Sequence, residues 1–415
     1  MTVENSLDIV IVGAGLGGLA AAYRSAQVGH KVQLFEARSS LGPRGGGIKV
    51  RPNASRFLLD WGLQQDIEAI SNIAVCTNYR NGVTGDVLLR TEPRTAASGY
   101  ADFGTLRDEA QQMFLRRANE AGAHIAFGVS VVSVSESDQG ATVHLGSGPS
   151  PGPQLGTAIL HQVLLDESDL LTDPDTKCLV SSTDLNVFTA TDGAGYVVCK
   201  FQPWTRRYNV LFGVPDTQTS NVRLWEETRH LDTVRQHFRD WNPALKAVLG
   251  MVKSCNRWRV TQMPELASWA SQGGRLFLLG DSAHAMFPDA AQGFSQTIED
   301  IAALSYLLKH TSFGLPRISA FARANSLAFQ GGFEAQRVKA KVPDPAQQVD
   351  LNDIEPDRDA DFADPAFLKW VFSYDAVEEV QLYIAELHSV ENLAIMADPR
   401  IVSNSPIVSR DGAFA

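Results

Sequence analysis

Three glycines near the start of the chain have a spacing that lets backbone approach a pyrophosphate: Gly13, Gly15 and Gly18. They follow the apolar run Leu7–Val12 and precede an Ala- and Leu-rich segment that ends at Gly29. The first glycine permits a tight turn, the second lets phosphate approach, and the third lets helix pack on strand. A second apolar run ends at Glu36, whose carboxylate can accept from ribose hydroxyls. This order predicts a dinucleotide site; the alternative is a glycine-rich turn in an unrelated α/β protein.

A second strand end of this kind occurs late in the chain. The apolar run Arg275–Leu279 predicts a strand, and Gly280-Asp281 follows it before a helix that contains Ile298. Ligands of open α/β sheets bind at such carboxyl ends of strands. Asp281 can accept from a ribityl hydroxyl, although it could also be only a helix N-cap. His284 is in a position that is more often structural than catalytic.

Two further features between these strand ends point to an anionic ligand. The segment 37–48 is too rich in glycine to form regular structure, so it is either backbone packed on a cofactor or a surface loop. Arg107 begins a predicted helix over 106–121, where a cation opposes the helix dipole. Arg107 therefore either reaches an anion or is a solvated surface residue.

Composition describes an ordinary globular protein. The 415 residues are 44% hydrophobic and 20% charged, and the formal net charge is −11. This acidity argues against a nucleic-acid surface, which needs clustered cations. We expect no signal peptide, no membrane helix, no metal site and a cytoplasmic location. Four scattered cysteines are expected to be reduced core residues: Cys76, Cys178, Cys199 and Cys255.

The alternation of patterns predicts an interleaved domain order. An α/β fold is expected, in which a Rossmann-like nucleotide-binding domain is combined with a mixed or antiparallel substrate sheet and C-terminal helices. The nucleotide-binding parts are predicted at residues 1–72, 101–150 and 266–335. The substrate parts are predicted at 73–100 and 151–265, and the C-terminal helical segment at 336–415. The breaker-rich stretch 146–153 marks the clearest boundary.

These motifs together resemble the group A FAD-dependent aromatic hydroxylases, and most of all the fungal salicylate-hydroxylase-like monooxygenases. The N-terminal glycines and Glu36 are shared by many flavoproteins, whereas Gly280-Asp281 before Pro288 and Gln292-Gly293 is more specific. The segments Val342-Pro343-Asp344 and Phe372–Ala376 look like that group's "LPDG" and "W-x-x-x-YDA" segments. The resemblance runs in patches from Leu7 to about Leu387.

The resemblance implies FAD as cofactor and gives each matching residue a role. Gly13, Gly15 and Gly18 would face the pyrophosphate, Glu36 the adenosine ribose, and Arg107 the ribityl–phosphate region. Gly47 would lie by the flavin, Asp281 would bind ribityl hydroxyls, and Pro288 would sit over the ring. Gly293 and Phe294 would line the isoalloxazine, although the family usually has a small residue at the second position. NAD(P)H would reduce the flavin, and O₂ would then supply oxygen for an electron-rich substrate.

One departure from the family pattern is large. The family has an apolar strand leading to "GADG" before the substrate sheet, but here the chain passes from Val143–Leu145 through the breaker-rich stretch directly into Leu155–Ala158. A core strand and its Asp-Gly turn are therefore missing, which leaves neighbouring ladder groups unpaired at about 1–3 kcal/mol for each buried group. A mispredicted gene model, a degenerate copy and a repurposed flavoprotein all remain open.

The same region holds the candidate catalytic residues. The arginine that related fungal enzymes carry on this strand is absent, and His161 is the nearest polar replacement. Tyr196 and Tyr208 are both candidate tyrosines of the substrate sheet, and the sequence does not choose between them. The function expected is hydroxylation of an aromatic or polyketide-like small molecule. The alternative is a descendant that keeps FAD but is inactive or acts as a cyclase or isomerase.

Overall fold

The computed structural model describes residues 6–42, 46–73, 76–91, 99–146, 154–190, 195–215, 226–262, 266, 268–286, 288, 291–309, 353–358, 360, 364–382 and 384–385, without the side chains of 154–158, 226, 261 and 262. The chain divides into two compact units, residues 1–374 and 375–415. The stretch 147–153 and the segment Val342–Asp344 lie outside the described residues.

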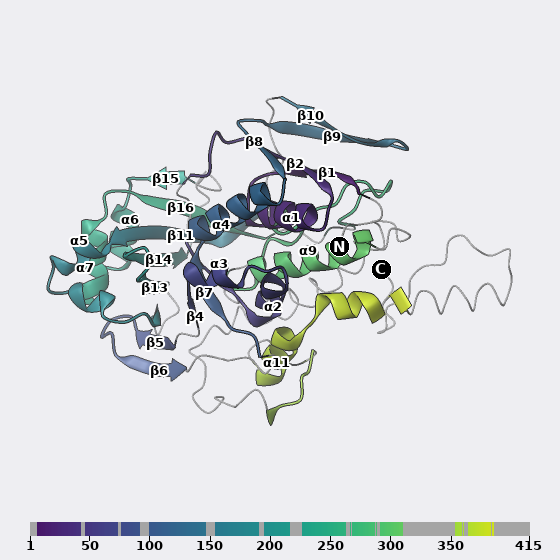
Figure 1. Cartoon of the computed structure of the whole chain (residues 1–415). Helices are drawn as coiled ribbons and strands as arrows, with labels where there is room; N and C mark the ends of the chain where they lie inside the picture. The colour runs from purple at the N-terminus through teal and green to yellow at the C-terminus, as the bar shows by residue number, and fades with distance from the viewer. Residues whose placement is uncertain are drawn as a thin grey trace. The chain divides into compact units, whose positions relative to one another are not determined.

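The first unit begins with the predicted strand–helix–strand motif. Strands β1 (Asp8–Val12) and β2 (Lys31–Glu36) are parallel, and helix α1 (Leu16–Gln27) connects them. Strand β8 (His124–Phe127) adds in parallel to β2, so the sheet has the order β1-β2-β8. Helix α4 (Arg107–Glu120) packs against α1, and Figure 1 shows both helices on one side of this sheet. The Rossmann-like part of the fold prediction is confirmed.

No residue of β1 is fully buried, although the run Leu7–Val12 is mostly apolar. Within the described chain β1 pairs only with β2, so it is an edge strand. Alternate side chains point to solvent, and Val10 and Val12 are 44% and 54% exposed. Strands rich in apolar residues on both faces are typical of sheet interiors. The exposed valines therefore lie where the missing strand and its surroundings leave the sheet open.

The prediction of a strand over Arg275–Leu279 is wrong. This segment makes one isolated antiparallel bridge, between Phe277 and Ala270. Its backbone is held instead by the side chain of Glu136 in β9 (Val131–Ser137), which accepts from the backbone N–H of Arg275 at 2.6 Å. A strand exists only through its neighbours. The segment lacks a partner strand among the described residues and remains irregular.

The substrate sheet has eight strands, and their order in the sheet differs from their order along the chain. From one edge to the other the order is β15-β16-β11-β14-β13-β12-β5-β6, antiparallel except for the β12–β5 pair. Its strands are β5 (Thr77–Asn81), β6 (Val87–Thr91), β11 (Gln154–Asp166), β12 (Leu185–Thr189), β13 (Tyr196–Gln202), β14 (Arg207–Pro215), β15 (Glu226–Thr228) and β16 (Cys255–Gln262). The two strands β5 and β6 thus leave the nucleotide-binding part of the chain and join the substrate sheet.

The other elements cover these sheets or connect them. They are β3 (Gly47–Val50), α2 (Pro52–Asp60), α3 (Gln64–Ala69), β4 (Ser71–Ile73), β7 (Phe103–Leu106), β9 (Val131–Ser137), β10 (Gly140–Leu145), α5 (Glu167–Leu171), the 3₁₀ helix η1 (Lys177–Val180), α6 (Asp232–His237), α7 (Pro243–Met251), α8 (Asp281–His284), α9 (Gly293–Lys309) and α11 (Pro365–Ser373). Pro52 and Pro243 each occupy the first turn of their helices, where a missing N–H costs nothing.

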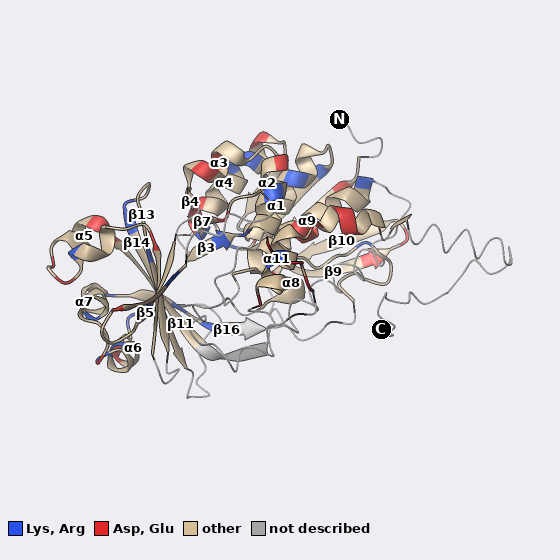
Figure 2. Cartoon of the chain, turned by 90° about the horizontal axis from the view of Figure 1, so that it is seen from below, with Lys and Arg blue, Asp and Glu red and all other residues tan. Residues whose placement is uncertain are grey.

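The two faces of the large sheet have different neighbours. Figure 2 shows α5, α6 and α7 on one side of the sheet, and β3, β7 and α11 on the other. The helical side, called here the back face, holds an extensive apolar cluster, with Phe212 and Phe238 in edge-on contact. The other side, called the front face, holds a smaller cluster in which Leu160 packs near Phe372 of α11.

Three of the four cysteines are buried as predicted, but Cys178 is exposed on η1. The prediction that all four belong to the core is therefore wrong for this one. Among the described residues no helix is both long and apolar enough to span a bilayer. The same residues contain no cluster of three or more candidate metal ligands.

The open side of β1 leads to a stability prediction. Val10→Thr and Val12→Thr should each change the free energy of unfolding by less than about 0.5 kcal/mol, because both side chains are already hydrated. Leu34→Ala, at a fully buried position of β2, should cost about 2–5 kcal/mol. Urea unfolding measures all three. Threonine variants as costly as Leu34→Ala would show that another segment covers β1.

Candidate flavin site

The glycine turn after β1 is held in a conformation that needs glycine. Gly13 has a φ of +98°, and its N–H donates to the carbonyl of Phe35 at 2.7 Å. A Cβ on Gly18 would collide with the carbonyl oxygen of Gly13, so helix α1 can pack this close only without a side chain there. Around Gly13 and Gly15 a Cβ would meet no atom within 4 Å. The turn is thus closely packed at Gly18, whereas the space beside Gly13 and Gly15 contains no protein atom within 4 Å.

The start of α1 offers its N–H groups to a ligand. Gly15 is the N-cap, no side chain caps the helix, and the first turn has no acid. The loop before it is fixed by Gln111 of α4, whose buried amide donates to the carbonyl of Ala14 at 3.2 Å. Free N–H groups and the helix dipole favour an anion at this end.

Glu36 is buried beside the glycine turn and is ionised. Its carboxylate accepts from the backbone N–H of Ala14 at 2.7 Å and from Nε of Arg38 at 2.8 Å. Burial alone would raise the pKa of Glu36, but the hydrogen bonds from Arg38 and Ala14 outweigh it and lower the pKa. An ionised acceptor at the end of β2 is suited to ribose hydroxyls.

Arg107 is half-buried at the start of α4, and its backbone N–H donates to the carbonyl of Gly46 at 3.0 Å. Its guanidinium has no ion pair or hydrogen bond with the described residues. Gly47, which lies in β3, pairs with Leu106, the residue before Arg107. The glycine-rich loop and the arginine therefore meet, and this favours the anion-binding alternative for Arg107 over a solvated surface residue.

The two predicted strand ends lie against one side chain of α9. A Cβ on Gly17 would be 2.8 Å from Cγ2 of Thr297, and one on Gly280 would be 3.0 Å from its Oγ1. Gly280 has a φ of +59° and is itself the N-cap of α8, so Asp281 is not a cap and its exposed carboxylate makes no capping bond. The backbone at Gly17 and the backbone at Gly280 therefore lie against the same threonine side chain.

The predicted flavin-lining residues begin helix α9. Gly293 is its first residue, and its carbonyl accepts from Thr297 Oγ1 at 2.8 Å. Phe294 meets Phe114 of α4 edge-on, with ring centroids 6.0 Å apart. Pro288 is exposed, and its carbonyl accepts from Ala291 N–H at 2.9 Å. The first turn of α9 has no acid, as for α1.

A buried pair ties the Asp281 turn to α9. His284 Nε2 lies 2.6 Å from Asp300 Oδ2, and both side chains are almost fully buried. Trp269 packs on the imidazole, with ring centroids 5.1 Å apart. Burial would lower the pKa of His284, but the charge and hydrogen bond of Asp300 outweigh it and raise the pKa. His284 therefore links two segments of the site through Asp300, in agreement with a structural role.

The three candidate catalytic residues of the substrate sheet do not come together. His161 lies opposite Phe212, which lies opposite Val197, so the three side chains share the back face. Tyr196 lies opposite Gly213, which lies opposite Leu160, and it therefore belongs to the front face. His161 is 5% exposed, and burial, then the charge of Arg257, lowers its pKa to about 4. A neutral imidazole behind the sheet is not positioned with Tyr196.

The same alternation of side chains along the strands places the two candidate tyrosines on opposite faces of the sheet. Tyr208 is fully buried in the back-face cluster, and burial raises its pKa. The front face instead presents polar residues that sequence reasoning missed. Gln162 donates to Asn209 Oδ1 at 3.0 Å, and Lys200 lies directly opposite Asn209. Because side chains alternate along a strand, the sequence alone could have placed Lys200 on the same face as Tyr196. Its neighbours on other strands could not be predicted without the pairing register.

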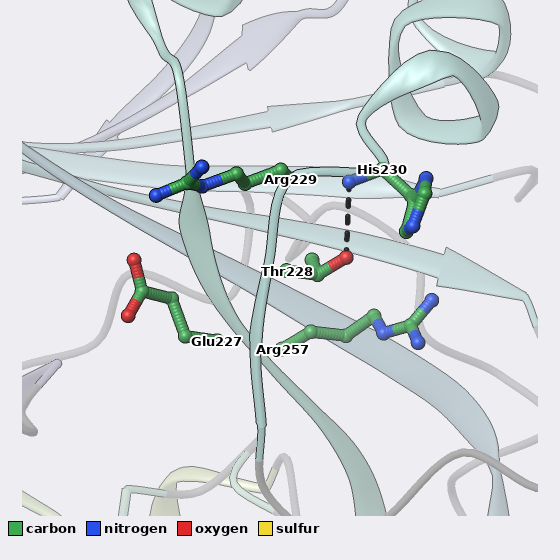
Figure 3. A pocket seen from close by; sticks show the side chains of 5 residues that line it. All are labelled: Glu227, Thr228, Arg229, His230 and Arg257. Carbon is green, nitrogen blue, oxygen red and sulfur yellow. Dashed lines mark hydrogen bonds between the residues drawn. The ribbon is translucent and has the colours of Figure 1, made fainter.

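A separate cavity of about 410 Å³ lies at the β15–β16 edge. Figure 3 shows its lining, with the N–H of His230 donating to Thr228 Oγ1 at 3.1 Å. The other lining residues are Glu227, Arg229 and Arg257. None of the predicted cofactor residues lines this cavity, and Arg257 lies opposite His161 on the back face. It is therefore distinct from the region where the two strand ends meet.

The residues present fit a flavin nucleotide. The open space over Gly13 and Gly15, the ionised Glu36 and the half-buried Arg107 supply complementary groups for a pyrophosphate and a ribose. Asp281 supplies a further exposed acceptor beside Gly280, against the same Thr297.

Comparisons with known proteins agree with this geometry. Residues 11–65 match an NAD(P)-binding Rossmann-like domain, and residues 156–314 match an FAD binding domain. The FAD-dependent monooxygenase OpS4 of Beauveria bassiana is 26% identical over 91% of this chain and 97% of its own length. Hispidin-3-hydroxylase of Neonothopanus nambi is 27% identical over 74% of this chain and 81% of its own length.

Solved structures share the fold. CtdE in complex with FAD and a substrate superposes with a TM-score of 0.75 at 18% identity, over 94% of this chain and 100% of its own. A salicylate hydroxylase substrate complex superposes with a TM-score of 0.62 at 18% identity, over 91% of this chain and 98% of its own. The expected α/β fold and the resemblance to flavin-dependent monooxygenases are confirmed.

Gly18→Ala tests the tight side of the turn. The added methyl would collide with backbone, so we expect a loss of about 1–3 kcal/mol in the free energy of unfolding. Gly250→Ala is the matched control, because Gly250 is in α7 with no atom near its Cβ position. It should gain up to about 1 kcal/mol from helix propensity. Equal effects of the two variants in urea unfolding would contradict the close approach.

Asp300→Asn tests the buried pair. Because the pKa of His284 is raised on folding, the pair stabilises the fold fully below the ordinary histidine pKa and loses this effect as pH rises through the folded pKa. The variant should therefore cost about 3–5 kcal/mol near pH 6 and less in alkaline solution. Urea unfolding at several pH values measures the difference. A cost independent of pH would rule out a charged His284.

Proposed function

Because this chain is similar to FAD-dependent monooxygenases over most of its length, we propose that it uses NAD(P)H and O₂ to hydroxylate an aromatic or polyketide-like small molecule. The observation that supports this most is the meeting of the glycine turn and the Gly280–Asp281 turn on Thr297. Two phosphate- and ribityl-type sites far apart in sequence become parts of one site. OpS4, a relative named as an FAD-dependent monooxygenase, matches 91% of this chain.

The proposed division of roles follows from the geometry. The N–H groups at the start of α1 and the guanidinium of Arg107 hold the pyrophosphate, and Glu36 accepts from the adenosine ribose. Asp281 accepts from ribityl hydroxyls, while Gly47, Gly293 and Phe294 line the ring. When bound, FAD supplies the redox chemistry, taking electrons from the nicotinamide and activating O₂.

The chain's own contribution to the reaction is positioning and exclusion of water. The front face of the substrate sheet presents Tyr196, Leu211 and Leu160 beside α11, which gives one side of the region an apolar and aromatic surface. Such a surface suits an aromatic ring and keeps water from the reacting atoms. Pro288 is proposed to sit over the flavin ring. His161 does not share this face and is dropped from the proposed catalytic set.

A second candidate function is favoured by the open edge of β1. A descendant that has lost the strand beyond β1 could bind FAD without productive use of the nicotinamide, and could act as a cyclase or isomerase or be inactive. The exposed Val10 and Val12 are the observation behind this alternative.

Asp281→Ala tests whether the protein binds a flavin through the proposed site. The purified wild-type protein should be yellow, and the variant should lose most of its bound flavin because an acceptor of the ribityl chain is gone. Asp240→Ala is the control, because Asp240 is an exposed acid that pairs with its neighbour Arg239. Flavin released by acid is quantified for each protein. Unchanged flavin content in Asp281→Ala would count against the whole site assignment.

The wild-type protein then distinguishes the two candidate functions. A monooxygenase should consume NADPH or NADH faster when an aromatic substrate is added, and the product should gain one oxygen atom from ¹⁸O₂. A flavin-retaining protein with no stimulated nicotinamide oxidation over a panel of phenols and aromatic acids would favour the non-oxidative descendant.

A further inference from the structure

Lys200 is a buried cation on the front face of the substrate sheet. It lies in β13 between Val198 and Gln202, and it is 6% exposed. Its ammonium makes no ion pair or hydrogen bond with the described part of the chain. A lysine is almost never buried without a partner, because removing its charge from water is costly. Its burial here therefore needs an explanation.

The acids nearest to Lys200 are already neutralised by other groups. Asp102 pairs with Arg51 at 2.8 Å and with Lys49 at 3.5 Å. Asp184 pairs with Arg90 at 2.6 Å and accepts from Asn78 at 3.1 Å. Each of these two acids is thus already paired with at least one other cation.

The surroundings of Lys200 leave room for its ammonium and connect it to the flavin region. A Cβ on Gly104 of β7 would lie 2.9 Å from Lys200 Nζ, so the lysine occupies space that a side chain would fill. Asn209, directly opposite Lys200, accepts from Gln162. A Cβ on Gly47 would lie 3.2 Å from Asn209 Nδ2. Lys200 is therefore one cross-strand step from the residue proposed to lie by the flavin.

The electrostatics of this position favour a missing anion. Burial lowers the pKa of Lys200 to about 8, with the charge of Lys49 acting in the same direction and those of Asp102 and Asp184 opposing it. An ammonium held near this value is charged at neutral pH but poorly compensated. An anionic ligand would supply the absent charge and would raise the pKa again.

We propose that Lys200 is the specificity-determining cation of the substrate site, and that the substrate is an aromatic molecule with a carboxylate or phenolate group. This rests on the proposed monooxygenase function and adds the charge of the substrate to it. The apolar part of the ligand packs on the surface formed by Tyr196 and Leu211, and its anionic group reaches Lys200. Gln162 and Asn209 offer amide groups to the same ligand.

The test compares two probes that differ in charge but not in shape. Benzoate and benzamide are titrated into the purified holoprotein, and binding is followed by calorimetry together with the change in the flavin spectrum. Wild type should bind benzoate more tightly than benzamide at pH 7. Lys200→Met should weaken benzoate binding by about tenfold or more and leave benzamide binding unchanged. Lys246→Met is the control, because Lys246 is exposed on α7, behind the sheet.

The pH dependence gives a second readout that needs no variant. Benzoate remains ionised from about pH 6 to about pH 9.5, so a loss of affinity in that range reports the protein. Wild-type affinity should begin to fall as pH rises past about 8, because Lys200 of the free protein then loses its charge. Lys200→Arg keeps its charge throughout, so its benzoate affinity should be flat over this range.

Three results would overturn the proposal. They are an equal effect of Lys200→Met on both probes, a wild-type benzoate affinity that does not change with pH, and loss of flavin in Lys200→Met with benzoate affinity retained. The last result would assign Lys200 to the cofactor. Calorimetry does not require flavin, so a wild-type protein without flavin that still shows the charge-dependent binding would contradict the proposed function alone.

Discussion

The packing of two glycine turns on the side chain of Thr297 is the contact on which the candidate site depends. Gly17 and Gly280 come from opposite ends of the chain, and neither position has space for a Cβ beside that threonine. Each turn alone would be a weak anion or hydroxyl site. Both turns lie against the same helix, as the proposed nucleotide site requires. The buried His284–Asp300 pair then keeps the second turn on α9.

The two faces of the large sheet carry different kinds of side chain. Its back face is an apolar core covered by helices, and the titratable groups found there have pKa values shifted away from neutrality by burial. Its front face combines an aromatic surface at Tyr196 with the amides of Gln162 and Asn209 and the ammonium of Lys200. The position of the polar residues on one face explains how a sheet without the family's arginine can still present a cation.

Among the described residues, neither segment that leads into the proposed nucleotide-binding turns is enclosed in a sheet. Strand β1 is an edge strand with exposed valines, and Arg275–Leu279 is an irregular segment held by Glu136. Gly17 and Gly280, which follow these segments, nevertheless both lie against Thr297. The close approach of the two turns therefore rests on their packing against α9.

The sequence by itself determined the features that depend on local chemistry. The glycine spacing, the acid at Glu36, the order of strands and helices and the need for glycine at Gly18 all follow from short-range sterics and hydrogen bonding. Tertiary structure alone decided which side chains share a face. His161 and Gln162 are adjacent in sequence, yet strand alternation and register send them to opposite sides of the sheet. The role proposed for Lys200 depends on its neighbours Gly104, Asn209 and the paired acids. Segments distant in sequence bring these residues close to it.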